Sequence, residues 1–306
     1  MLKLPVIVAP MFLVSTPKMV IEAGKAGVIG SFPLLNARPV EQCAEWLKEV
    51  KEGIGDIPWA VNFICHKETN ARYEDDLTLI RDYQPPIVIT SLGNPREVKE
   101  IVHGYGGLVY SDVANVRHAK KAAQTGVDGL ILVCAGAGGH AGILNPFAFL
   151  SEVRGFYEGT IILAGSISNG ADIAAAQMMG ANYVYMGTRF LAAAESNAQE
   201  DYKQMVLDAS LDDILYTNAF SGVHASVLIP SLLKEGIDPK TLKPKNEIDL
   251  SHLVNVKAWR DIWSAGQGVN NVTKRETTKE IVEALQTEYE KGVASFVQNH
   301  SNNFAR

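Results

Sequence analysis

The sequence predicts an α/β protein folded as a (β/α)8 (TIM) barrel. Eight short apolar runs occupy its first two-thirds, and a stretch with helical character separates each run from the next. The runs are continuously apolar rather than alternating, as in parallel strands with both faces buried. A count of eight favours a closed barrel over the alternative, an open doubly wound sheet. The runs are Pro5–Pro10, Val28–Phe32, Trp59–Ile64, Pro86–Leu92, Leu108–Val113, Gly129–Cys134, Thr160–Ser166 and Tyr183–Thr188.

The connections between these runs have helix signals at their ends. Thr16 is placed to cap a helix that begins with Pro17 and ends at Gly27, the preferred order of proline first and glycine last. Helical connections of this kind are what parallel strands need as crossovers. The predicted helices are Pro17–Gly27, Val40–Gly53, Glu74–Asp82, one opened by Asn94–Pro95, Asn115–Gly126, Pro146–Gly155 and Asn169–Gly180.

The alternation of strands and helices stops after Leu191. We therefore expect a barrel domain over residues 1–200 and a mostly helical cap over residues 201–271 that covers the barrel mouth. Within the cap, Asp213–Ser226 mixes strand-like and loop residues. A last helix over residues 277–299 is expected to return to the barrel. Its start is predicted by a capping box, which Thr277 and Glu280 can form.

Composition and charge exclude several classes of partner. The chain has 306 residues, a net charge of −6 and a pI of about 5.7, so neither nucleic acid nor an anionic membrane is expected to be its main partner. No stretch approaches the roughly 20 apolar residues that span a bilayer. The three cysteines lack metal-ligand spacing, so we expect no metal site and a reducing, cytoplasmic location. A small-molecule substrate is expected, and a homodimer is compatible with the sequence.

A candidate catalytic histidine follows the sixth run. The stretch Gly129–Gly142 (GLILVCAGAGGHAG) passes from a buried strand into small residues around His140. Small residues such as Gly138 and Gly139 let a flat ligand or another backbone approach closely, because no Cβ intervenes. An imidazole in this setting can exchange protons near physiological pH. The alternative is that His140 only satisfies a turn carbonyl.

A phosphate site is predicted at the ends of the seventh and eighth runs. Gly165 and Ser166 end one run, and Gly187 and Thr188 end the next. The corresponding loops of such barrels commonly bind phosphate through backbone N–H groups. Arg189 either adds a cation to this site or pairs with a carboxylate on the barrel wall.

Other strand ends offer groups that suit a planar ring. Asn62 presents a carboxamide, which can donate to and accept from the edge of a flavin or nucleobase, and its alternative role is to cap a loop. Pro10 and Met11 offer backbone groups and apolar surface under such a ring, or simple core packing. Ser111 and Asp112 could reach a ribityl or sugar hydroxyl.

Weaker candidates for the substrate pocket lie close after the third run and in the expected cap. His66 and His224 are less favoured than His140 as pocket histidines, since neither lies in a glycine-rich strand end. The side chains proposed to line the substrate pocket from the cap are Tyr202, Phe220, His224 and Trp263.

Taken together, these motifs resemble the nitronate monooxygenase family, formerly called 2-nitropropane dioxygenases. The resemblance covers nearly the whole chain and is also shared with flavin enoyl-acyl-carrier-protein reductases and NAD(P)H:quinone reductases of the same superfamily. The segments that resemble the family are PVIVAPMFLVSTP, WAVNFI, VRHAKKAAQTGVDGLILVCAGAGGHAG, ILAGSISNGADIAAAQMMGANYVYMGTRFLAAAES and WSAGQG.

The resemblance implies an FMN-dependent barrel with a substrate-binding cap. It implies oxidation of alkyl nitronates, and of nitroalkanes, by dioxygen as co-substrate, giving carbonyl compounds and nitrite. His140 matches the catalytic histidine, Asn62 and Met11 match residues beside the flavin, and Gly138 and Gly139 flank its ring. Gly165, Ser166, Gly187 and Thr188 match the phosphate loops.

Two other functions stay open at this stage. One is an NAD(P)H-dependent FMN reductase of enoyl thioesters or quinones, and the other is a flavin- or nucleotide-binding protein without its own turnover. The chain departs from the reductase branches at Ala9–Phe12, where those often have Gln-Gly-Gly-Met, and at Ser111, where quinone-reductase-like members can have lysine. Both departures favour the nitronate monooxygenase branch.

Overall fold

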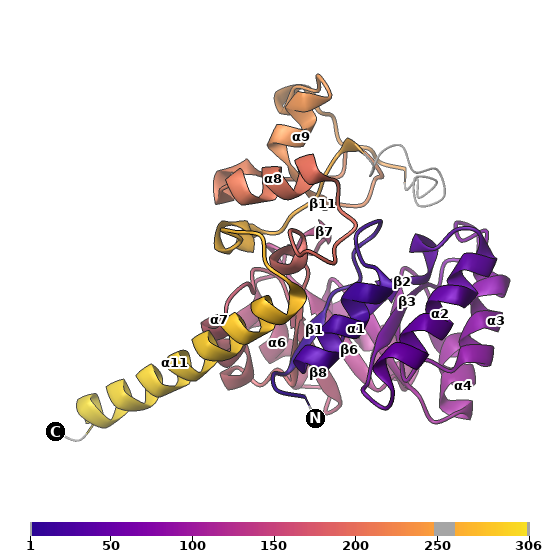
Figure 1. The fold of residues 1–306 in the computed structure, drawn as a ribbon, viewed down its shortest axis with the longest axis horizontal. Helices are drawn as coiled ribbons and strands as arrows, with labels where there is room; N and C mark the ends of the chain where they lie inside the picture. Colours follow the sequence, from indigo (N-terminus) through magenta and orange to yellow (C-terminus); the bar gives the residue numbers. More distant parts are fainter. Residues whose placement is uncertain (1, 248–260, 305–306) are drawn as a thin grey trace.

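A computed structural model describes residues 2–247 and 261–304 and shows the predicted barrel (Figure 1). Its eight-stranded sheet has the order β1-β9-β8-β6-β5-β4-β3-β2, and every pairing within it is parallel. A parallel bridge between Ile7 and Ile29 joins the first strand to the chain just before the second, so the sheet closes. The strands are β1 (Val6–Val8), β2 (Ser31–Pro33), β3 (Ala60–Ile64), β4 (Ile87–Ser91), β5 (Leu108–Val113), β6 (Gly129–Val133), β8 (Thr160–Ala164) and β9 (Tyr183–Met186).

Helices connect the strands as expected, and their ends follow the predicted signals. The Thr16 side chain accepts a hydrogen bond from the Met19 N–H, and Gly27 ends the same helix with a φ of 104°. Such a φ is easy only for glycine. Asn169 and Asp172 form a capping box at the start of another helix. The helices are α1 (Pro17–Ala26), α2 (Val40–Ile54), α3 (Tyr73–Tyr83), α4 (Arg96–Gly104), α5 (Val116–Gln124), α6 (Pro146–Arg154) and α7 (Gly170–Met178).

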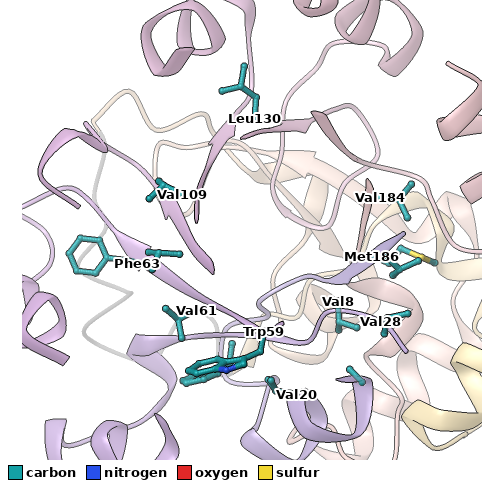
Figure 2. Close-up of a cluster of buried hydrophobic side chains, with 14 of the residues drawn as sticks. Val8, Val20, Val28, Trp59, Val61, Phe63, Val109, Leu130, Val184 and Met186 are labelled. Atoms are coloured by element: carbon teal, nitrogen blue, oxygen red, sulfur yellow. The ribbon is translucent and has the colours of Figure 1, made fainter. Parts of the chain in front are cut away.

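Two apolar layers bury the two faces of each strand. The outer layer lies between strands and helices, and part of it, including Val61, Val109 and Leu130, is shown in Figure 2. The inner layer fills the barrel and includes Ile89 and Tyr110. Because side chains alternate along a strand, the position two residues beyond an inner-layer residue also faces the barrel interior. This alternation therefore identifies which strand-end side chains can reach the barrel mouth.

The expected cap lies over one end of the barrel (Figure 1) and contains strands as well as helices. Its elements are α8 (Glu200–Asp208), β10 (Ile214–Thr217), β11 (Ala225–Leu228), α9 (Ile229–Lys234) and the 3-10 helices Leu211–Asp213, Pro239–Thr241 and Gln267–Asn271. The two strands form an antiparallel sheet with β7 (Gly139–His140), which belongs to the loop after β6. The division of the chain at residue 200 stays a prediction, and residues 248–260 of the expected cap lie outside the described residues.

The last helix, α11 (Thr278–Phe304), is longer than the predicted 277–299 segment. It packs against α7 and α1, and its later part extends away from the barrel (Figure 1). A Cβ on Gly170 would lie 2.1 Å from the Tyr289 nitrogen, so the glycine allows this close approach. Both the N–H and the hydroxyl of Thr277 donate to Glu280, as the capping signal predicts. No helix in the described part of the chain has the length and apolar character needed to cross a membrane.

Candidate active site

A cavity of about 920 Å³ lies at the carboxyl ends of the barrel strands, with the cap contributing part of its wall. This is the end of the barrel where active sites of this fold are found, and the volume suits a small-molecule site. The structure brings all of the predicted site residues to this one cavity, although their individual roles stay predictions. The residues are Pro10, Met11, Asn62, Ser111, Gly138, Gly139, His140, Gly165, Ser166, Gly187 and Thr188.

His140 is held in place by the cap. Its Cα pairs with that of Ala225 across the β7–β11 ladder, and the neighbouring Ala141 N–H donates to the His224 carbonyl at 3.2 Å. The Gly139 N–H donates to Ser264 Oγ at 2.9 Å. The backbone on both sides of the imidazole is therefore fixed by the cap, while the residue itself lines the cavity.

The ends of β8 and β9 form a cradle of backbone N–H groups. Gly165 has a φ of 116° and Ser166 a φ of 58°, so both residues adopt left-handed conformations. Within the described residues, the N–H groups of Gly165, Ser166, Gly187 and Thr188 donate no backbone hydrogen bond. Four unused donors on two adjacent strand ends are suited to an anion such as phosphate.

A cap loop over residues 264–268 braces this cradle. The Gly266 N–H donates to Thr188 Oγ1 at 2.9 Å, and the Gln267 N–H donates to the Gly136 carbonyl at 2.8 Å. Sequence analysis identified this loop only as part of the family-like WSAGQG segment. Its contacts show that it joins the β6 loop to the end of β9.

Hydrogen-bonded polar side chains on β3, β4 and β5 line the cavity and form a series that we call the polar chain. Asn62 Nδ2 donates to Ser91 Oγ at 2.7 Å, and Ser91 Oγ donates to Asp112 Oδ2 at 2.5 Å. Burial raises the pKa of Asp112 to about 6, while the hydrogen bond from Ser91 acts in the opposite direction. Burial and the nearby Asp112 also raise the pKa of Tyr185 well above its usual value. Asp112 Oδ1 and the Tyr185 hydroxyl are both buried and have no hydrogen-bond partner among the described residues.

Of the two neighbours at the end of β5, Asp112 faces the barrel interior. It lies two residues beyond Tyr110, which belongs to the inner layer. Ser111 lies on the same outward face as the outer-layer residues Val109 and Val113, and its hydroxyl lies 2.6 Å from Thr90 Oγ1. Sequence analysis gave both residues the same role, because it could not assign them to faces. Tyr185 was also not singled out, although its inward position follows from strand alternation.

Arg189 pairs with a carboxylate, which agrees with the second of its two predicted roles except for where that carboxylate lies. Its Nη2 lies 2.8 Å from Glu276 Oε2, and both side chains are buried, with exposed fractions of 7% and 4%. The carboxylate comes from the segment just before α11, not from the barrel wall. Arg189 is therefore committed to an ion pair between the end of β9 and the start of the last helix.

The cap residues proposed for the pocket divide into two pairs. Tyr202 and Trp263 line the cavity and stack on each other with ring centroids 5.0 Å apart. Phe220 and His224 are not among the described residues that line it, and neither is His66. His224 stacks instead on Tyr216, at 4.9 Å. Among the described residues, no group of three or more His, Cys, Asp or Glu side chains is arranged to hold a metal ion.

The closed barrel and the cavity at its carboxyl end define a TIM-barrel enzyme. The family model for nitronate monooxygenase matches residues 31–288, and the chain belongs to this family. It is thus an oxidoreductase of the nitronate monooxygenase type. The family is flavin-dependent.

Individual proteins are similar to this chain over most of its length. A nitronate monooxygenase from Paraburkholderia phytofirmans is 28% identical over 285 residues, covering 78% of this chain and 77% of that protein. The solved structure of nitroalkane oxidase from Streptomyces ansochromogenes matches with a TM-score of 0.81 at 23% identity, covering 96% of this chain and 97% of the other. FabK from Thermotoga maritima matches with a TM-score of 0.79 at 23% identity, covering 97% and 96%. At these identities the two solved structures show a shared fold.

Proposed function

We propose that this protein oxidises alkyl nitronates, and nitroalkanes, with dioxygen to carbonyl compounds and nitrite, using FMN bound in the cavity. The observation that supports this most is the placement of His140 at the same cavity as the N–H cradle of β8 and β9. A phosphate group and a reacting centre can therefore share one site. The name of the Paraburkholderia phytofirmans relative supports the substrate class.

The residues present fit FMN on structural grounds. The four unused N–H groups at Gly165, Ser166, Gly187 and Thr188 would hold its phosphate. A Cβ built on Gly139 would meet no atom within 4 Å, so this part of the cavity wall is open for a flat ring. Met11 would supply apolar surface beside that ring. When bound, FMN supplies the redox chemistry with the nitronate and dioxygen.

His140 would handle the proton of the substrate. In a neutral nitroalkane it removes the proton from the carbon beside the nitro group, and in a nitronate it donates a hydrogen bond to the nitro oxygens. Either role needs a group within hydrogen-bonding reach of the substrate. The β7–β11 pairing provides the fixed position that such a group requires.

The test is an anaerobic reduction experiment on the purified protein. NADH, NADPH and propionate 3-nitronate are added in separate cuvettes while the visible flavin spectrum is recorded. We expect the nitronate alone to bleach the flavin and nitrite to form when air is admitted. Bleaching by a nicotinamide alone would instead assign a reductase of enoyl thioesters or quinones. A colourless protein that FMN does not reconstitute would overturn both functions.

The three cysteines support the expected reducing, cytoplasmic setting for this reaction. Cys43, Cys65 and Cys134 are all free and buried. Burial raises the pKa of each thiol to about 12, so all three are protonated and unreactive at neutral pH.

A further inference from the structure

The polar chain formed by Asn62, Ser91 and Asp112 runs over three consecutive strands, β3, β4 and β5. Asn62 Nδ2 donates both to Ser91 Oγ, at 2.7 Å, and to the Ile89 carbonyl, at 3.2 Å. Ser91 in turn donates to Asp112 Oδ2. All three side chains also line the cavity. The polar chain therefore links the buried carboxylate of Asp112 to the Asn62 carboxamide, which is predicted to face the flavin.

The charge on Asp112 fixes the direction of both hydrogen bonds made by the Ser91 hydroxyl. An ionised carboxylate only accepts hydrogen bonds, so the Ser91 hydroxyl must donate to it. The Ser91 oxygen is then left to accept from the NH2 group of Asn62, as the Ile89 carbonyl also does. Asn62 Oδ1 is left over, and it accepts no hydrogen bond from the described residues.

We propose that Asp112 is a positioning residue that, acting through Ser91, holds the Asn62 carboxamide with its oxygen toward the cavity, where it accepts a hydrogen bond from the ring N–H of the bound flavin. This inference rests on the proposed function for the identity of the bound group. The oxidised flavin ring has a single N–H, at N3, and its other polar ring atoms only accept. A carboxamide turned the other way would present donors to this N–H and would lose the hydrogen bond.

Protonation of Asp112 would weaken the preference of the Asn62 carboxamide for this orientation. The carboxyl has a pKa raised to about 6, because burial disfavours its charge. Once protonated, it can donate to Ser91, and the Ser91 hydroxyl is then free to donate toward Asn62. Among the described residues, the titratable groups that interact with Asp112 are Tyr185 on β9 and Cys65 just after β3. Burial holds the pKa of the phenol well above its usual value and that of the thiol at about 12, so both stay neutral near pH 6.

The test compares FMN affinity in three variants of the full chain. Asp112→Asn and Ser91→Ala break the polar chain in two different ways. Asp76→Asn is the matched control, because Asp76 is also a buried carboxyl with a pKa raised to about 6 but lies on α3, outside the set of cavity-lining residues. The dissociation constant is measured by titrating flavin-free protein with FMN and following the flavin fluorescence, at about pH 8 and about pH 5. Thermal unfolding of each variant shows that it is folded.

We expect Asp112→Asn and Ser91→Ala to raise the FMN dissociation constant about fivefold to tenfold at high pH, as loss of one ordered hydrogen bond would. The wild type should bind more weakly at the lower pH, partly because the FMN phosphate itself takes up a proton at about pH 6. Both variants should therefore show a smaller pH dependence than the wild type, whereas Asp76→Asn should keep the full one. A second probe is 3-methyl-FMN, which lacks the ring N–H. Methylation should weaken binding to the wild type more than to Asp112→Asn.

The outcomes separate this inference from the proposed function. If the wild type binds FMN and Asp112→Asn binds it equally well with the same pH dependence, the role of Asp112 is overturned while the proposed function stands. If methylation weakens wild type and variant equally, the inference is again overturned. If the wild type binds no FMN at all, the proposed function falls, and this inference falls with it.

Discussion

A Cβ on Gly138 would lie 2.8 Å from the nitrogen of Gly266, and a Cβ on Gly266 would lie 2.8 Å from the nitrogen of Gly138. The loop after β6 and the cap loop over residues 264–268 are thus packed backbone against backbone. The absence of a side chain at Gly138 is needed for this contact, whether or not the residue also flanks a flavin ring. The contact lies two residues before His140.

Substituting Gly266→Ala should push these two loops apart. We expect the free energy of unfolding to fall by about 1–3 kcal/mol, as overpacking of a tight contact does. Nitrite production should fall more strongly than FMN affinity, because the displaced loop contains His140. Gly104→Ala is the control, since a Cβ there would meet no atom within 4 Å and its φ is not positive. Equal urea denaturation curves for Gly266→Ala and wild type would show that the loops can move apart freely.

Replacing His140 should separate binding from proton transfer. The variant His140→Asn is expected to retain FMN, because the N–H cradle belongs to other strands. Its rate with a neutral nitroalkane should fall about 10²–10⁴-fold, the usual contribution of a general base. The loss with a preformed nitronate should be smaller, since no carbon-bound proton has to be removed. Wild-type turnover of the nitroalkane by this variant would remove His140 from the mechanism.

The buried carboxyl of Asp112 should make the flavin-free protein less stable as the pH rises. Its pKa is raised in the folded state to about 6, so its contribution to stability is full below the ordinary aspartate value and is lost as the pH rises through 6. Asp112→Asn should therefore be more stable than the wild type at about pH 8, by about 1–3 kcal/mol. The advantage should vanish near pH 4, where both side chains are neutral. Urea denaturation at the two pH values measures this, and an advantage that is the same at both would contradict it.

The buried pair of Arg189 and Glu276 should be important for stability rather than for phosphate binding. Glu276→Leu leaves the guanidinium buried without its carboxylate, so we expect a loss of about 3–5 kcal/mol in the free energy of unfolding. The double variant Arg189→Met with Glu276→Leu should regain much of that loss. If the double variant is instead as unstable as the single one, packing rather than charge explains the effect. FMN affinity of the folded double variant should stay close to that of the wild type.

The barrel could be predicted because its signals are local. Continuous apolar runs such as Gly129–Cys134 and Thr160–Ser166 contain β6 and β8, and the caps at Thr16 and Asn169 lie where helices begin. The site residues could be found as a group for a related reason. The carboxyl ends of parallel strands meet at one end of a barrel, so residues that end strands gather there.

The parts that could not be predicted depend on contacts between distant segments. β7 is only two residues long, and its partner β11 lies in the cap, so no local alternation signals the pairing. Arg189 and Glu276 are 87 residues apart, and nothing near Arg189 indicates which of its two roles applies. The polar chain Asn62–Ser91–Asp112 depends on which side chains of three strands point into the barrel. Short apolar runs do not define this.

The pairing of β7 with β11 has a consequence for how this enzyme family can be recombined. The residues proposed to hold the FMN phosphate belong to the barrel, but the backbone beside His140 is hydrogen-bonded to the cap. Exchanging the cap between relatives would therefore move His140, the group proposed to transfer the proton, as well as the walls of the substrate pocket. A chimera that joins this barrel to a foreign cap would inherit a new reactivity along with a new selectivity, unless the β11 segment were kept.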